Sequence, residues 1–136
     1  MDMKQFTHVA LDEKFSNLKT TNENGRRYYE TPEGHYPSVT TVTGWEKKNF
    51  FAKWRRDNPK ESRRVLNRGN KLHSLIEEYI DNNLDSNSGI DLPILDLFLQ
   101  LQPELDNIDN ILAQEIPLWS STLELAGRVD CVANYN

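Results

Sequence analysis

The sequence predicts an α/β protein in which helices lie between strands near the two ends of the chain. Residues 26–36 hold two aromatic segments around Thr-Pro-Glu-Gly, which predicts a tight turn and a β-hairpin. Residues 59–84 carry apolar side chains at the three- and four-residue spacing of one helix face. Residues 113–119 and 125–135 are typical of two strands, joined by a Ser-Ser-Thr turn. At 136 residues the chain is long enough for one domain with a core.

The N-terminal segment predicts a weak strand over 6–11, followed by a polar loop with little to bury. Residues 37–43 either continue a strand or begin a helix. Their β-branched side chains favour the strand, whereas Ser38 and Thr40 are suitable N-caps for a helix. A helix with apolar residues on one side and basic residues on the other is expected over 45–57.

Pro59 predicts the start of the longest helix, because proline is favoured at the first helical position. The expected buried face of this helix comprises Val65, Leu66, Gly69, Leu72, His73, Ile76, Tyr79, Ile80 and Leu84. Glycine in a helix interior costs about 1 kcal/mol against alanine, so Gly69 indicates close approach of another backbone or a ligand. Residues 85–89 predict a loop, and 92–112 predict one or two acidic amphipathic helices interrupted near Pro103.

The formal net charge of −5 is distributed unevenly along the chain. Residues 46–72 hold 10 basic and 3 acidic side chains, net +7, whereas residues 73–136 hold 1 basic and 12 acidic, net −11. A basic block beside an acidic one suits a protein that binds phosphates with one surface and metal ions with another. Two solvated helix faces of opposite sign would give the same pattern, and charge alone favours neither interpretation.

The composition also bears on the compartment. No apolar run approaches the roughly 20 residues of a membrane span, so a membrane partner is not expected. The first residues lack the plan of a secretory signal. A single cysteine, Cys131, excludes an intrachain disulfide and a cysteine-based zinc site. We therefore expect a reducing, cytoplasmic location.

Four titratable residues stand in otherwise apolar patterns. His73 and Glu77 are four apart and therefore share one face of the predicted helix. Glu115 and Asp130 lie in the two C-terminal strands, where a buried carboxylate is costly unless a cation or donor meets it. Each residue also has a structural interpretation: a core histidine, a helix-rim acid or a solvated strand acid. Together with a basic helix and its tryptophans, they indicate metal-dependent chemistry on a nucleic acid.

Three motifs carry a resemblance to a known family. They are Tyr36-Pro37-Ser38-Val39-Thr40-Thr41-Val42, Arg68-Gly69-x-x-x-His73-x-x-x-Glu77, and Glu115-Ile116-Pro117-Leu118-Trp119-Ser120 with Ala126-Gly127-Arg128-Val129-Asp130. Together they resemble RecB-like nucleases of the PD-(D/E)XK superfamily, especially the mitochondrial genome maintenance exonuclease group and its tailed-phage relatives. The resemblance implies an N-terminal arm over 1–27 and an incomplete nuclease domain over 28–136. It implies a restriction-endonuclease-like α/β core, a small mixed sheet flanked by helices, that stops after the strand carrying Asp130.

The resemblance implies a metal-dependent DNA exonuclease that hydrolyses phosphodiesters, prefers single strands and uses Mg²⁺ or Mn²⁺. By motif, Asp130 corresponds to the first acid of the catalytic pair and to a metal ligand. His73 corresponds to a metal-site residue, and Glu115 to an acidic position of some members. Glu77 is a further candidate on the same helix face as His73.

The expected DNA contacts follow from side-chain chemistry. Trp45 and Trp54 suit stacking with unpaired bases, and Ser38 and Thr40 suit a phosphate at a helix start. The basic side chains of residues 46–72 suit contacts with the phosphate backbone of a DNA strand. The predicted DNA-binding residues are Ser38, Thr40, Trp45, Lys53, Trp54, Arg55, Arg56, Arg68 and Lys71.

The sequence departs from the family in one respect. The family carries a (D/E)-x-K motif on the strand after the position of Asp130, and here no lysine follows Lys71. We therefore expect weak metal binding and no appreciable hydrolysis by this chain alone. A C-terminal fragment or second chain that supplies the motif is an expected partner, and a phage gene an expected source. Two alternatives remain: a non-catalytic single-stranded DNA-binding remnant, and a protein-interaction module whose acidic 92–112 segment docks onto a replication or recombination complex.

Overall fold

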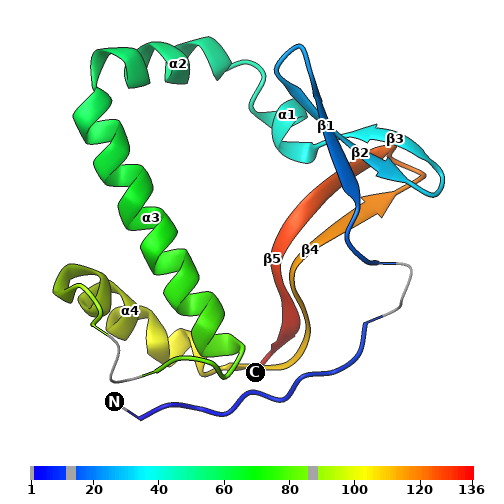
Figure 1. Cartoon of the computed structure of the whole chain (residues 1–136). Coiled ribbons are helices and arrows are strands. Elements are labelled where there is room, and N and C mark those ends of the chain that lie inside the picture. The colour runs from blue at the N-terminus through cyan, green and yellow to red at the C-terminus, as the bar shows by residue number, and fades with distance from the viewer. Residues whose placement is uncertain (1, 12–14, 86–88) are drawn as a thin grey trace. The chain divides into compact units, whose positions relative to one another are not determined.

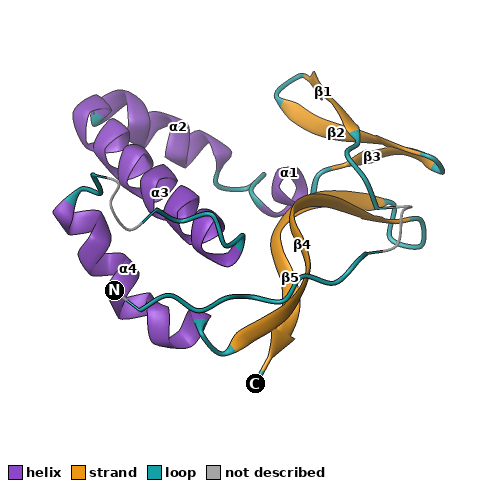
Figure 2. Ribbon diagram, turned by 60° about the horizontal axis from the view of Figure 1, so that its bottom comes forward, coloured by secondary structure: helices purple, strands orange, loops and turns teal. Residues whose placement is uncertain are grey.

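The computed structural model describes residues 2–11, 15–85 and 89–136. It contains both helices and strands, which confirms the α/β prediction (Figures 1 and 2). The chain divides into two compact units, which are treated separately below. The first comprises Met1–Val9, Asp57–Leu112 and Val132–Asn136, and the second comprises Ala10–Arg56 and Ala113–Cys131.

The second unit contains a three-stranded antiparallel sheet in the order β1-β2-β3 (Figure 1). Its strands are β1 (Lys19–Glu23), β2 (Arg26–Thr31) and β3 (Gly34–Pro37). The β2–β3 hairpin confirms the turn predicted at Thr-Pro-Glu-Gly. Strand β1 lies where a polar loop was expected, so that prediction was wrong. The connection from β1 to β2 is Asn24-Gly25, with φ of 53° and 76°, which is the positive-φ pattern of a type I′ hairpin turn.

Two short helical elements follow the sheet. Helix α1 (Val39–Thr43) settles the alternatives for 37–43 in favour of a helix. The Ser38 hydroxyl caps it by accepting a hydrogen bond of 3.0 Å from the Thr41 backbone N–H. Helix α2 (Lys48–Asp57) begins three residues later than expected and has no buried residue.

The C-terminal hairpin consists of β4 (Ile108–Ser120) and β5 (Leu125–Tyr135), which confirms both predicted strands. Strand β4 begins within the segment expected to be helical, so the helix prediction for 108–112 was wrong. The reason is a long-range pairing: the Ile111 N–H donates to Thr7 and its carbonyl accepts from Val9, each at 2.7 Å. Among the described residues, parallel pairing occurs at two isolated bridges, His8–Ile111 and Ser38–Ala126, rather than in the expected mixed sheet.

The core of the second unit is small. Tyr29, Tyr36 and Ala126 are buried together, and Leu18 and Trp119 pack against them. The core thus joins the β2–β3 hairpin to the start of β5, through aromatic side chains that bury much area each. Within the second unit, this core therefore holds the β2–β3 hairpin against the parts of β4 and β5 that belong to the same unit.

The first unit is built on α3 (Pro59–Ile80) and α4 (Leu92–Leu105), and α3 begins at Pro59 as predicted. Its core centres on Tyr79, whose ring meets Phe6 and Phe98 edge-to-face at centroid distances of 5.2 and 5.1 Å. Because Phe6 is buried here, the expectation that the N-terminal segment has little to bury was wrong. Helix α4 continues through Pro103, which falls in its last turn, rather than breaking there.

The buried face of α3 is shorter than the sequence predicts. Leu75, Tyr79 and Ile80 are buried near the end of the helix, whereas Val65 and Leu66 are exposed. A side chain at Gly69 would meet no atom within 4 Å, so the predicted close approach there is wrong. The ring contacts of Phe6 and Phe98 fall at the C-terminal end of α3, which accounts for the difference.

In the described part of the chain, no helix combines the length and hydropathy needed to cross a bilayer. The loop expected over 85–89 lies partly outside the described residues, which omit 86–88.

Candidate nucleic-acid interface

The most distinctive surface feature of the second unit is Trp45, in the connection between α1 and α2. The Arg26 guanidinium carbon lies 4.2 Å from the centroid of the Trp45 ring, and the Lys48 ammonium lies 5.2 Å from it. The Trp45 side chain is nevertheless 47% exposed. Cations near the ring restrict its orientation through cation–π attraction. The protein therefore presents an oriented aromatic surface and two positive charges at one place.

A cavity of about 380 Å³ lies beside this ring, and we call it the Trp45 pocket. Three of its lining residues are basic, and none of them is acidic among the described residues. The lining consists of Asn22, Gly25, Arg27, Thr40, Thr41, Gly44, Trp45, Lys48, Phe51 and Arg55. Because Arg27, Lys48 and Arg55 line the pocket without an acid beside them in this lining, they give it a positive potential that suits an anionic ligand.

Gly25 helps to build this pocket. A Cβ at position 25 would lie 2.5 Å from the Lys48 ammonium, so glycine leaves room for that side chain. The β1–β2 turn thereby brings Arg26 and Lys48 to the same tryptophan. Trp45 was predicted as a DNA-binding residue, but Arg26 and Lys48 were not. Lys48 lay in the basic block, whereas no local signal marked Arg26.

Helix α2 adds further aromatic and basic side chains. Phe50, Phe51 and Trp54 are exposed. The predicted DNA-binding residues Lys53, Arg55 and Arg56 lie on the same helix and are also exposed. Exposed apolar groups gathered on one element indicate a binding surface. We refer to Trp45, Lys48 and α2 together as the α2 surface.

The structure gives Ser38 and Thr40 different roles. The Ser38 hydroxyl is buried, donates to the Thr41 hydroxyl at 2.7 Å and accepts from the Thr41 N–H. This hydroxyl also lies 3.2 Å from that of Thr40, and Ser38 lines a cavity of this unit, so the predicted phosphate contact stays a prediction. Thr40 lines the Trp45 pocket and remains compatible with that contact.

The two predicted strand acids share one side of the β4–β5 hairpin. Glu115 accepts a hydrogen bond of 3.1 Å from the Arg128 guanidinium and forms an ion pair with it. Arg128 and Asp130 are two residues apart on β5 and therefore face the same way. Asp130 is exposed, so its carboxylate does not bear the cost of burial considered from the sequence.

Glu115 has an unusual backbone. Its φ is 51°, in the left-handed region that few residues other than glycine, asparagine and aspartate adopt. Such a conformation inside a strand changes the direction of a side chain, much as a β-bulge does. Here it accompanies the contact with Arg128, on the neighbouring strand.

Burial raises the pKa of the Cys131 thiol, and the neighbouring Asp130 carboxylate raises it further. The charge of Asp130 therefore acts electrostatically on the neighbouring Cys131 in the same strand. Carboxylates such as Glu115 and Asp130 are the ligands that Mg²⁺ and Mn²⁺ prefer. Arg128 competes with any cation for Glu115, which favours weak binding.

His73 and Glu77 lie one turn apart on α3, in the first unit. They share one helix face, as predicted, but His73 is exposed rather than part of a buried apolar face. An imidazole and a carboxylate at this spacing can hold one divalent cation between them. Each unit thus carries its own pair of predicted site residues.

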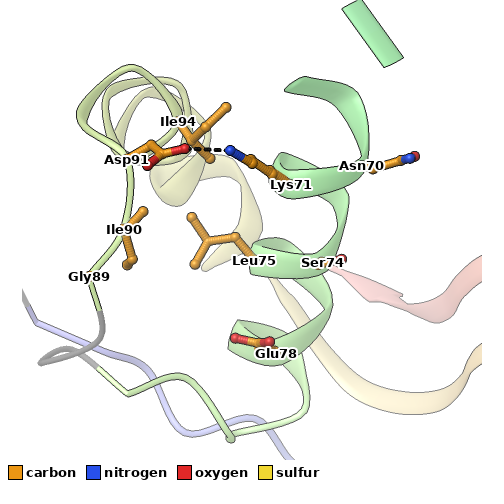
Figure 3. Close-up of a pocket in the computed structure, with 9 residues that line it drawn as sticks. All are labelled: Asn70, Lys71, Ser74, Leu75, Glu78, Gly89, Ile90, Asp91 and Ile94. Atoms are coloured by element: carbon orange, nitrogen blue, oxygen red, sulfur yellow. Dashed lines mark hydrogen bonds and ion pairs between the residues drawn. The ribbon is translucent and has the colours of Figure 1, made fainter. Parts of the chain in front are cut away.

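The remaining predicted DNA contacts, Arg68 and Lys71, also lie on α3. The Lys71 ammonium forms an ion pair of 2.6 Å with Asp91, at the edge of a cavity of about 450 Å³ (Figure 3). Leu75, Ile90 and Ile94 line the same cavity. The Asp91 charge offsets that of Lys71 and weakens its attraction for phosphate. The pKa of Glu61 is lowered, chiefly by its hydrogen bond with Arg64. The positive charge of Arg68 lowers this pKa further.

Comparison with known proteins adds no assignment. No protein-family model matches the chain, and no curated protein or solved structure is significantly similar to it. The resemblance to RecB-like nucleases therefore rests on the sequence motifs.

Proposed function

We propose that this protein binds single-stranded DNA through the α2 surface and that it does so as part of a RecB-like, metal-dependent exonuclease. The observation that carries the DNA-binding proposal is the half-exposed Trp45 ring with Arg26 and Lys48 beside it. Bases and phosphates are the two chemical parts of a nucleic acid strand. An oriented aromatic ring and adjacent cations provide a contact for each.

Single strands are favoured because stacking on a side chain needs an unpaired base. Stacking contributes roughly 1–3 kcal/mol per base and depends little on sequence. The guanidinium of Arg26 is planar and itself stacks with bases, and the flexible stem of Lys48 lets its charge reach a phosphate. The acid-free lining of the Trp45 pocket supports the same choice of ligand.

Catalysis is the second part of the proposal. Asp130 and Glu115 would offer carboxylate ligands to a divalent cation from the β4–β5 hairpin. His73 and Glu77, one turn apart on α3, would offer a second pair of donors within the first unit. A bound Mg²⁺ or Mn²⁺ lowers the pKa of water and neutralises charge on the phosphate. The chemistry of these donors fits such a cation, and Arg128 is placed to offset the charge of Glu115 when no cation is bound.

A metal titration tests this part. We expect weak Mn²⁺ binding, observed as loss of the free-ion signal in electron paramagnetic resonance, and weaker binding in the Asp130→Asn variant. The matched control is Asp109→Asn, which removes an acid from a different part of the chain. Equal Mn²⁺ binding by the wild type and both variants would contradict a metal role for Asp130.

One observation favours a protein-interaction role instead. Helix α4 exposes Leu92, Leu99 and Leu101, together with acidic residues of the 92–112 segment. Exposed leucines on an acidic helix suit docking onto a basic partner protein. This alternative predicts no affinity for DNA, so a DNA titration separates it from the proposal.

The proposal is tested by charge reversal on α2. Fluorescence anisotropy with a labelled oligothymidylate measures the dissociation constant at low salt. The variant Lys53→Glu, Arg55→Glu, Arg56→Glu should bind on the order of tenfold or more weakly, because each reversal removes a favourable phosphate contact. The control Lys60→Glu, Arg63→Glu, Arg64→Glu has the same net charge but changes α3. An equal loss in both variants would contradict a role for the α2 surface.

A further inference from the structure

The second unit contains another pocket, and two of its lining residues, Ser38 and Thr40, are among the predicted DNA-binding residues. It has a volume of about 600 Å³ and is formed by residues from β2, α1 and the β4–β5 hairpin. Its walls are mainly apolar and aromatic, and include Tyr29, Val39, Leu118, Trp119, Leu123 and Leu125. Val39 and Leu123 are exposed, at 43% and 69%. We call it the hairpin pocket.

The hairpin pocket adjoins the Trp45 pocket, because Arg27 and Thr40 line both. Arg128 also lines the hairpin pocket, and none of its lining residues in the described chain is acidic. The pocket thus combines an apolar interior with two arginines. Arg27 lies where the two pockets meet, and Arg128 is also the ion-pair partner of Glu115.

We propose that the hairpin pocket takes a second nucleobase of the same single strand whose first base stacks on Trp45. This inference rests on the proposed function and adds a base-binding site to it. A pocket of this size with aromatic walls fits an unstacked base. Arg27 contacts the phosphate between the two pockets, because it borders both. The charge of the lining complements a polyanion, and the apolar and aromatic walls favour a ligand that also carries a base.

Arg128 connects the hairpin pocket with the proposed metal-binding acids. Arg128 joins the pocket lining to Glu115, and Asp130 lies two residues further along the same face of β5. A base held in the hairpin pocket therefore brings the phosphate of its own nucleotide toward Glu115 and Asp130. The pocket residues act as positioning residues in this arrangement, since they contact the base and not the scissile bond.

Photo-crosslinking tests the inference. An oligonucleotide of about ten nucleotides is made with 5-iododeoxyuridine at every position, irradiated with the protein, and the linked residues are found by mass spectrometry. Iodouracil crosslinks to aromatic side chains that it contacts. We expect crosslinks at Trp45 in the Trp45 pocket and at Tyr29 or Trp119 in the hairpin pocket.

Two valines of α1 provide a matched pair of variants. Val39 lines the hairpin pocket, whereas Val42 is exposed on the same helix and lines neither pocket. The Val39→Glu variant should lose the crosslink at Tyr29 or Trp119 and keep the one at Trp45, because its carboxylate repels the strand from the pocket. Val42→Glu has the same net charge and should keep both crosslinks. Leu123→Glu should behave as Val39→Glu does.

The outcomes separate the two proposals. Crosslinking at Trp45 without any in the hairpin pocket would overturn this inference and leave the DNA-binding proposal intact. An unchanged hairpin-pocket crosslink in both Val39→Glu and Leu123→Glu would also overturn it. Failure of the wild type to bind or crosslink the oligonucleotide at all would overturn the DNA-binding proposal and this inference with it.

Discussion

Trp45 is half exposed, yet the side chains of Arg26 and Lys48 lie against its ring. A tryptophan that served only the core would be buried. The ring of Trp45 instead borders a cavity with a basic lining. Its surroundings fit contact with a base better than structural packing.

The Trp45→Ala variant should weaken binding of single-stranded DNA by about 1–3 kcal/mol, because the stacking contact is lost. That corresponds to a rise in the dissociation constant of roughly five- to 150-fold. Anisotropy titration with oligothymidylate measures the change. Tyr135→Ala is the control, since Tyr135 is also an exposed aromatic residue but lies on β5, outside the α2 surface. An equal loss in both variants would contradict a specific role for Trp45.

The pKa of Cys131 reports the charge of Asp130. Burial raises this pKa, and the Asp130 carboxylate raises it further. The thiolate is the reactive form, so a raised pKa slows alkylation at neutral pH. In Asp130→Asn the negative charge is absent, and the midpoint of the alkylation rate against pH should move to lower pH. Iodoacetamide labelling followed by mass spectrometry measures it, with Asp109→Asn as the control. An unchanged midpoint would show that Asp130 does not act on Cys131.

At the scale of elements, the β1–β2 hairpin depends on its two-residue turn. Gly25 has φ of 76°, and a Cβ there would meet the Lys48 ammonium. Gly25→Ala should therefore lower the free energy of unfolding by about 1–2 kcal/mol, the cost of a left-handed conformation for a residue with a Cβ. It should also weaken DNA binding by displacing Lys48.

Gly69→Ala in α3 is the matched control for this substitution. Position 69 is helical and open, so alanine should raise the free energy of unfolding by about 0.5–1 kcal/mol. Urea denaturation followed by circular dichroism measures both variants. Effects of the same sign in the two variants would contradict the difference in backbone conformation.

Elements with local signals could be predicted from the sequence. Proline at the first position determined the start of α3, and Thr-Pro-Glu-Gly determined the β2–β3 turn. Asn24-Gly25 is also a strong hairpin signal, and it could have identified β1. By contrast, the strand at Ile111 depends on pairing with Thr7 and Val9, more than 100 residues away, which no local pattern encodes.

The candidate site was predictable to a similar extent. Side-chain chemistry identified Trp45 and the basic residues of α2. The contribution of Arg26 depends on the β1–β2 turn, and that of Arg27 on two pockets formed by segments far apart in sequence. The pairing of Glu115 with Arg128 follows from the register of β4 and β5, which strand periodicity alone does not determine.

At the scale of the whole molecule, the basic block divides between two units. The cations of α3 are partly offset by acids: Arg64 pairs with Glu61, and Lys71 with Asp91. Helix α2 belongs almost entirely to the second unit, together with the Trp45 pocket. The attraction for a polyanion should therefore come mainly from the second unit, although the block continues into the first.

The salt dependence of DNA binding tests the proposed function most directly. For a single strand, the logarithm of the binding constant falls against the logarithm of salt with a slope of about −0.7 for each phosphate contact. The wild type should bind oligothymidylate with a clearly negative slope, and Lys53→Glu, Arg55→Glu, Arg56→Glu should reduce its magnitude by up to about 2. Absence of binding at low salt, or the same slope in the wild type and this variant, would contradict DNA binding by the α2 surface.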